Sequence, residues 1–120
     1  MQSLNNTQPD VTVLSHSADK VSLALYISED IDYFRGHFPD APILAGVVQL
    51  DWAVKFAQQY LAFPAIVQDV EVLKFQVVTT VNMTVNLTLE RNKNGKCIFS
   101  YHSDKGQHAS GRLVFASQPL

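Results

Sequence analysis

The chain has little cysteine, no cluster of basic residues and no long apolar run. Its one cysteine, Cys97, excludes an intramolecular disulfide and offers no metal-ligand spacing, so we expect no metal site. Lys and Arg total 9 against 11 Asp and Glu, for a net charge of −2. Because nucleic-acid binding needs a clustered basic face, we expect no nucleic-acid partner. No run approaches the roughly 20 apolar residues that cross a bilayer, so no membrane segment is expected.

What is present is a short, apolar and lightly charged chain. Its 120 residues suffice for one hydrophobic core, with 47% apolar and 17% charged residues. A low charged fraction favours a surface that another subunit partly covers. The opening "MQSLNNTQPD" is polar and lacks the pattern of a signal peptide, so a cytoplasmic location is expected. We expect residues 1–10 to be a flexible leader and residues 11–120 to form a single domain.

One helix is predicted among several strands. Alternating polarity predicts two strands within residues 11–27, with a turn at residues 17–19. Residues 28–45 contain two prolines and are predicted to form a loop. Residues 46–61 are predicted to form a helix that ends before Pro64. This helix has almost no polar face, so we expect it to be buried on nearly all sides.

The remaining chain has the pattern of antiparallel strands. "AIVQDVEVLKFQV" is one long candidate strand, and "VNMTVNLTLE" alternates apolar and polar residues over its whole length. "RNKNGK" supplies an Asn-Gly hairpin turn, and "CIFSYHS" and "QHASGRLVFAS" complete a meander. Five or six antiparallel strands wrapped around one long helix make an α+β hotdog fold. Its open sheet edges favour pairing of subunits edge to edge.

The stretch "YFRGHFPDAPILAGVVQLDWA", residues 33–53, combines three chemical features. His37 lies in a proline-stiffened loop between Phe34 and Phe38, whose apolar bulk would exclude water. Gly46 stands at the helix N-terminus, where the first N–H groups have no intrahelical acceptor. Asp51 places a carboxyl group on an apolar helix stripe, where it needs a partner or a raised pKa. A base, an acid and carbonyl-binding N–H groups suit proton abstraction α to a carbonyl with loss of a β-hydroxyl, which is a dehydration.

Each feature alone also has an ordinary structural interpretation. A buried acid often orders the core through a hydrogen bond, a loop histidine is often exposed to solvent, and glycine is a common N-cap. The remaining histidines, His16, His102 and His108, lie in strand-like or turn segments with no acid at useful spacing. We expect them to have no catalytic role.

The segment "GHFPDAPILAGVVQLDWA" resembles the signature G-H-F-P-x-x-P-x-x-P-G, followed by a helix acid, of the β-hydroxyacyl-[acyl carrier protein] dehydratases. "PILAGVVQLDWA" and "SGRLVF" look closest to the small stand-alone dehydratases of aryl-polyene-type pathways. Two positions depart from the family. Ala45 replaces the proline before the glycine, which makes the helix entry less rigid, and "KFQVVTTVNM" lacks the usual Pro-Gly-Asp turn.

The resemblance implies a function and a role for each matching residue. His37 would remove the C2 proton of a 3-hydroxyacyl thioester, and Asp51 from a second subunit would act on the departing hydroxyl. The N–H groups of Gly46 and Val47 would hold the thioester oxygen. The product would be a trans-2-enoyl thioester in fatty-acid or polyene-type biosynthesis, made without a cofactor.

The resemblance also implies where the substrate binds. The acyl chain would occupy a tunnel lined by Phe34, Phe38, Val48 and Trp52. Acyl carrier protein is acidic, so Arg35 is the expected contact, with Lys74 and Arg112 as further candidates. The enzyme would be a homodimer or a higher homo-oligomer.

Two other function classes stay open. A hotdog thioesterase would use the carboxylate to activate water and would release free thiol. A non-catalytic acyl-binding hotdog subunit would keep the fold without turnover.

Overall fold

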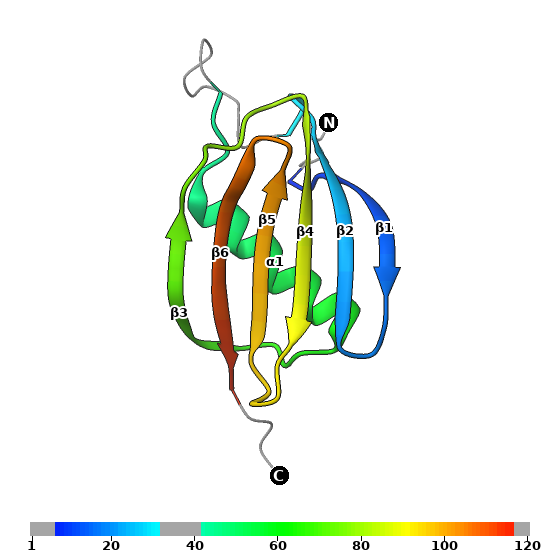
Figure 1. Ribbon diagram of the computed structural model, residues 1–120, viewed down its shortest axis with the longest axis vertical. Coiled ribbons are helices and arrows are strands. Elements are labelled where there is room, and N and C mark those ends of the chain that lie inside the picture. Colours follow the sequence, from blue (N-terminus) through cyan, green and yellow to red (C-terminus); the bar gives the residue numbers. More distant parts are fainter. Residues whose placement is uncertain (1–6, 32–41, 117–120) are drawn as a thin grey trace, which may run out of the picture.

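The computed structural model describes residues 7–31 and 42–116 as one antiparallel sheet with a single helix across its face (Figure 1). The elements in chain order are β1 (Asp10–His16), β2 (Lys20–Ile27), α1 (Gly46–Leu61), β3 (Val67–Phe75), β4 (Met83–Arg91), β5 (Cys97–Ser103) and β6 (Gly106–Phe115). The strands lie in the order β1-β2-β4-β5-β6-β3, so β1 and β3 are the two edges. The predicted helix and the six-stranded antiparallel sheet are therefore confirmed.

The core lies between α1 and the inner face of the sheet. Alternate residues of the central strands point inward, as their polarity pattern predicts. Trp52 and Phe56 of α1 pack against them and are 1% and 2% exposed. Burying a large apolar side chain contributes about 1.5–3 kcal/mol, so this layer holds the helix on the sheet. The apolar strand residues with no exposure are Val21, Leu23, Leu25, Ile27, Val85, Leu87, Leu89, Cys97, Phe99, Ala109 and Leu113.

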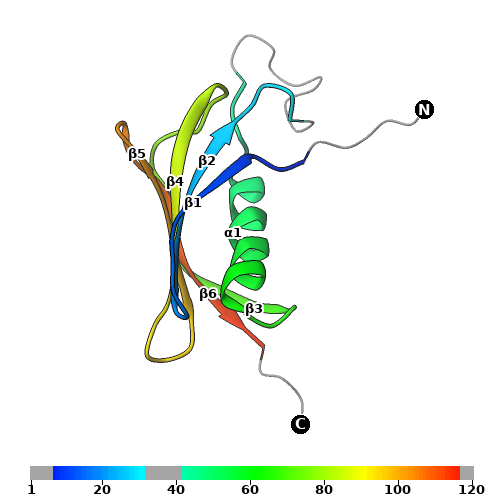
Figure 2. The ribbon, with the colours of Figure 1, turned by 90° about the vertical axis from the view of Figure 1, so that its right-hand side faces the viewer.

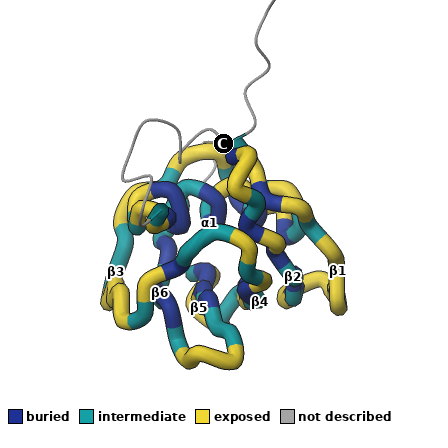
Figure 3. The backbone as a smooth tube through the Cα atoms, turned by 90° about the horizontal axis from the view of Figure 1, so that it is seen from above, coloured by how far each residue is buried: buried dark blue, intermediate teal, exposed yellow. Residues whose placement is uncertain are grey.

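The helix is buried on one side only, so the prediction that it is buried on nearly all sides is wrong for the single chain. Figure 2 shows α1 on one face of the sheet, which covers only the helix surface turned toward it. The opposite face carries Val47, which is 72% exposed, and the neighbouring edge strand β3 is also largely exposed (Figure 3). A single sheet can bury only one face of a helix. The second apolar face of α1 therefore has to be buried by another structural element or another subunit.

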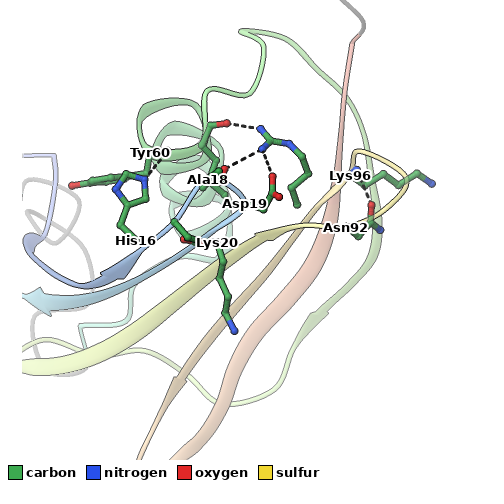
Figure 4. Close-up of polar contacts among 10 residues, drawn as sticks. His16, Ala18, Asp19, Lys20, Tyr60, Asn92 and Lys96 are labelled. Atoms are coloured by element: carbon green, nitrogen blue, oxygen red, sulfur yellow. Dashed lines mark hydrogen bonds and ion pairs between the residues drawn. The ribbon is translucent and has the colours of Figure 1, made fainter.

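The C-terminal end of α1 is anchored by polar contacts. Figure 4 shows His16 beside Tyr60, where the His16 Nε2–H donates to the Tyr60 carbonyl oxygen over 2.7 Å. Arg91 donates to the Leu61 carbonyl and pairs with Asp19 at 2.9 Å. Terminal carbonyls of a helix lack intrahelical donors, so these contacts fix this end. The opposite, N-terminal end is where the candidate site lies.

Two strand limits differ from the sequence pattern. β3 ends at Phe75 rather than continuing to Val77, and β4 begins at Met83 because Val81 and Asn82 form a turn. Asn82 has φ 61°, a left-handed conformation that Asn tolerates better than most residues. The segment between β3 and β4 thereby passes beside the entry of α1, and the Leu44 N–H donates to the Thr79 carbonyl over 2.7 Å.

Candidate active site

The N-terminus of α1 presents free backbone donors. Ala45, the N-cap residue, has φ −62° and ψ 146° and makes no side-chain capping bond. The N–H groups of Val48 and Gln49 both donate to the Ala45 carbonyl, over 3.1 and 3.2 Å. Neither the Gly46 nor the Val47 N–H makes a hydrogen bond to a described residue. The helix dipole adds partial positive charge there, so the site suits a developing oxyanion.

Gly46 is required by packing as well as by access. A Cβ on residue 46 would lie 2.7 Å from Cζ of Phe75, closer than real Cβ contacts come. The aromatic ring therefore occupies the space that any side chain at position 46 would need. This contact ties the end of β3 to the start of α1.

A cavity of about 430 Å³ lies at this junction, and we call it the helix-entry cavity. Its walls come from the chain before and within the first turn of α1 and from the segment after β3. The lining residues are Ile43, Leu44, Ala45, Gly46, Gln49, Phe75, Gln76, Val77 and Val78. Most of this lining is apolar, which suits an acyl group or its linker. The sequence pattern assigned "KFQV", residues 74–77, to a strand and so missed this part of the wall.

Asp51 lies in a different hollow. A groove of about 300 Å³ runs between α1 and β3, and we call it the α1–β3 groove; it is lined by Val47, Leu50, Asp51, Val54, Val67 and Val70. The Asp51 side chain is 43% exposed and pairs with Lys55 at 2.9 Å. The prediction of an apolar stripe around the carboxylate is confirmed, whereas its burial within one chain is wrong, because the sheet leaves this helix face open. Within one chain, Asp51 and the Gly46 N–H line separate hollows.

Four predicted site residues, Phe34, Arg35, His37 and Phe38, lie outside the described residues, so their roles stay predictions. Val48 and Trp52, predicted to line the acyl tunnel, belong to the core between α1 and the sheet. The Trp52 indole N–H donates to the Thr7 carbonyl over 2.9 Å. Neither residue lines the helix-entry cavity or the α1–β3 groove, and their tunnel role also stays a prediction.

A buried polar chain, which the sequence pattern did not reveal, supports the wall of the helix-entry cavity. We use this name for Ser103, His108, Thr79 and Gln49. His108 and Thr79 have no exposure and Gln49 is 4% exposed. His108 contacts Ser103 Oγ through Nε2 at 2.6 Å and Thr79 Oγ1 through Nδ1 at 3.1 Å. Gln49 in turn donates from Nε2 to the Leu44 carbonyl over 3.2 Å. His108 therefore has a structural environment that its sequence neighbours gave no reason to expect.

The helix backbone next to this chain is held by a buried phenol. Tyr101 donates its O–H to the Gln49 carbonyl oxygen over 2.6 Å. Burial, and to a smaller extent the negative charge of Asp51, raises the pKa of Tyr101 well above its usual value. The phenol therefore stays a neutral donor.

The comparisons with known proteins decide the family. The model of the ApeI-like family, described as ApeI dehydratase, matches residues 13–112. The chain belongs to the ApeI-like dehydratase family. It is accordingly a hotdog dehydratase, as the resemblance of the His37–Asp51 segment indicated.

Solved structures support this assignment. An ApeI:P dehydratase heterocomplex from Xenorhabdus doucetiae contains a chain with 29% identity and a TM-score of 0.83, covering 92% of this chain and 100% of that chain. An uncharacterized protein from Erwinia carotovora subsp. atroseptica has 27% identity and a TM-score of 0.71, with 92% and 97% coverage. Thioesterase superfamily member 2 from Mus musculus, at 14% identity and a TM-score of 0.67 over 86% and 78%, shares the fold. A search of curated protein sequences found no match.

The cations predicted to contact a carrier protein differ in their surroundings. Arg112 donates to Glu71 over 2.7 Å, and Lys96 donates to the same carboxylate oxygen over 3.0 Å. The hydrogen bonds from Arg112 and then Lys96 hold the pKa of Glu71 below its usual value. Because Arg112 and Lys96 share the single Glu71 carboxylate, the three side chains together keep a net positive charge, and Arg112 stays a candidate contact for an acidic partner alongside Lys74.

In the described segments, no group of three or more His, Cys, Asp and Glu side chains is arranged to hold a metal ion. No helix in that part of the chain is long and apolar enough to span a membrane.

Proposed function

We propose that this dehydratase converts a 3-hydroxyacyl thioester, carried on acyl carrier protein, into the trans-2-enoyl thioester. The observation that carries the proposal is the helix-entry cavity, a mostly apolar hollow that Gly46 lines. The N–H groups of Gly46 and of the next residue, Val47, make no hydrogen bond to a described residue. The thioester carbonyl accepts from these N–H groups and the acyl chain occupies the apolar space. Removing one donor from such an oxyanion site typically slows reaction by about 10²–10³-fold.

The proposed reaction balances without a cofactor. His37 removes the proton from C2, the electron pair forms the C2–C3 double bond, and the C3–O bond breaks. The hydroxyl leaves as water with a proton from Asp51 of the partner subunit. Exchange with solvent then returns His37 and the acid to their starting protonation states.

A second subunit is part of the proposal because Asp51 and the Gly46 N–H line separate hollows of one chain. We infer a homodimer that pairs along β3 and covers the α1–β3 groove. β3 is an edge strand with exposed apolar residues, among them Val72 at 61% and Phe75 at 49% exposed. Exposed apolar edges favour pairing with a second sheet. The similar ApeI protein occurs in a heterocomplex, so the mass of the purified protein in solution tests whether identical subunits suffice.

The test is product analysis by mass spectrometry. The purified protein is incubated with 3-hydroxyacyl carrier proteins of several chain lengths, with the same acyl groups on pantetheine, and with simple acyl thioesters. We expect loss of water from the 3-hydroxyacyl substrates and no release of free thiol. His37→Ala should lower this rate by about 10²-fold or more, in line with general-base contributions, while the oligomer persists. Thiol release from every substrate would instead show a thioesterase.

A further inference from the structure

Leu44 is held from both sides at the entry of α1. Its N–H donates to the Thr79 carbonyl over 2.7 Å, and its carbonyl accepts from the Gln49 side-chain amide over 3.2 Å. Leu44 directly precedes Ala45, whose conformation sets the direction in which the Gly46 N–H points. The Gln49 amide is almost fully buried, so losing its partner would leave a polar group unsatisfied.

The buried polar chain gives Gln49 one orientation. His108 Nδ1 lies 3.1 Å from the Val78 carbonyl, which only accepts, so Nδ1 carries a proton. Ser103 Oγ accepts from the Lys105 N–H over 3.1 Å and can donate its own hydrogen to His108 Nε2. The same Nδ1–H is shared between the Val78 carbonyl and the Thr79 hydroxyl oxygen, which lies 3.1 Å away, so the Thr79 hydroxyl can donate its own hydrogen to Gln49 Oε1 over 3.5 Å. The amide nitrogen of Gln49 is then the end that faces the Leu44 carbonyl.

The φ angle of Ala45 is one that a proline would also adopt. Its φ of −62° lies at the value that a proline ring imposes, and the related dehydratase signature has proline at this position. Its N–H makes no hydrogen bond within the described part of the chain. The hydrogen bonds to Leu44 therefore restrain the backbone conformation of Ala45, which a proline ring would restrain covalently.

We propose that Gln49 is a positioning residue, which holds Leu44 and Ala45. It thereby keeps the N–H groups of Gly46, which lines the helix-entry cavity, and of the next residue, Val47, in position for the thioester oxygen. The proposal rests on the oxyanion role of those N–H groups in the proposed function. Gln49 acts through the backbone and touches no reacting atom. Thr79 is its support, because its carbonyl accepts from Leu44 and its hydroxyl orients the amide.

The first test replaces Gln49 by Met, which keeps the side-chain length and removes the amide. We expect kcat to fall by at least about tenfold with KM within about threefold, because a misaimed donor loses transition-state binding. Gln58→Met is the matched control, since Gln58 lies on the same helix and donates to the Pro64 and Ala65 carbonyls at the other end, over 3.1 and 3.0 Å. Gln58→Met should lower stability and leave kcat unchanged.

The second test is rescue by proline. In the double variant with Ala45→Pro and Gln49→Met, the ring fixes φ without the amide, and we expect most of the lost kcat to return. If Gln49 only stabilised the fold, Ala45→Pro would not restore the kcat lost in Gln49→Met. Unchanged kcat in Gln49→Met, or a loss that Ala45→Pro leaves in place, would overturn the proposal.

Two substitutions at Thr79 test the same role with a smaller structural change, in case Gln49→Met fails to fold. Thr79→Val removes the hydroxyl and keeps the shape, whereas Thr79→Ser keeps the hydroxyl. We expect several-fold lower kcat in Thr79→Val and near wild-type kcat in Thr79→Ser, and equal kcat values in the two would refute the role. The His37→Ala variant separates the two proposals. If His37→Ala stays active, the proposed function is wrong. If His37→Ala is inactive but the Gln49 and Thr79 variants keep the wild-type kcat, only the positioning role is wrong.

Discussion

The Phe75 ring lies against Gly46 so closely that a Cβ at position 46 would be 2.7 Å from Cζ. The contact joins the end of β3 to the first residue of α1, and both residues line the helix-entry cavity. The shape of this cavity therefore depends on the fit between a glycine and one aromatic ring.

This fit predicts an interaction between substitutions at the two positions. Gly46→Ala should destabilise the protein by about 1–3 kcal/mol, as overpacking usually does, with the low end expected because the half-exposed Phe75 ring can move. Phe75→Leu should recover much of that loss in the double variant. Urea unfolding of the four proteins measures the coupling, and strictly additive free energies would contradict the contact.

Cys97 gives a prediction for alkaline pH. Burial raises the pKa of the Cys97 thiol from 9.0 to about 12. The thiol thus ionises in the unfolded chain at a lower pH than in the folded one, so the folded state holds more protons there. The free energy of unfolding should be independent of this group below pH 9.0 and should fall as pH rises from 9.0 to about 12. Cys97→Ala should flatten the decline in urea unfolding at successive pH values, and an unchanged slope would contradict the assignment.

Arg91 should matter for stability and leave catalysis unaffected. Its guanidinium contacts the Leu61 and Ala18 carbonyls and the Asp19 carboxylate and lies 4.4 Å from the centre of the Phe63 ring. Arg91→Met should lower the free energy of unfolding by about 1–3 kcal/mol, because partly buried acceptors lose a charged donor. Arg91→Lys should recover only part, since an ammonium cannot reproduce the forked contacts. Turnover of folded protein should stay at the wild-type level, and a specific loss of kcat would tie this end of α1 to the site.

In contrast to Arg91, Asp51 should affect turnover and contribute little to stability. Its ion pair with Lys55 is exposed and spans one helical turn, which is worth about 0.3–0.5 kcal/mol. Asp51→Asn should therefore change stability very little but lower dehydration by about 10²-fold or more. Lys55→Gln breaks the same pair and keeps the carboxyl group, so it should stay near wild type in turnover. Equal turnover of the two variants would remove Asp51 from the mechanism.

Much of the fold could be predicted because the local signals agree. α1 spans Gly46–Leu61 as predicted, since its apolar run is bounded by a glycine entry and a nearby proline. Strand pairing was less accessible to local patterns. β3 joins the sheet beside β6, at the opposite edge from β1, and nothing in the residues of β3 specifies that partner.

The candidate site was only partly predictable for the same reason. Gly46 and Asp51 stand out by chemistry within a short segment, but the Gln49 environment depends on residues 30 and more positions away. His108 and Ala109 are consecutive and both buried, which breaks the alternation of a strand. The register shift between Tyr101 and His102 in the pairing of β5 with β6 accounts for this, and a bulge cannot be read from polarity alone.

The most direct measurement is complementation between two inactive variants, His37→Ala and Asp51→Asn, co-expressed and purified as mixed oligomers. If each site takes its base from one copy and its acid from the other, half of the dimers are mixed and each mixed dimer has one intact site of two. Dehydration activity should then return to about one-quarter of the wild-type rate. Mixed dimers confirmed by mass that remain as inactive as the separate variants would contradict a site shared between subunits.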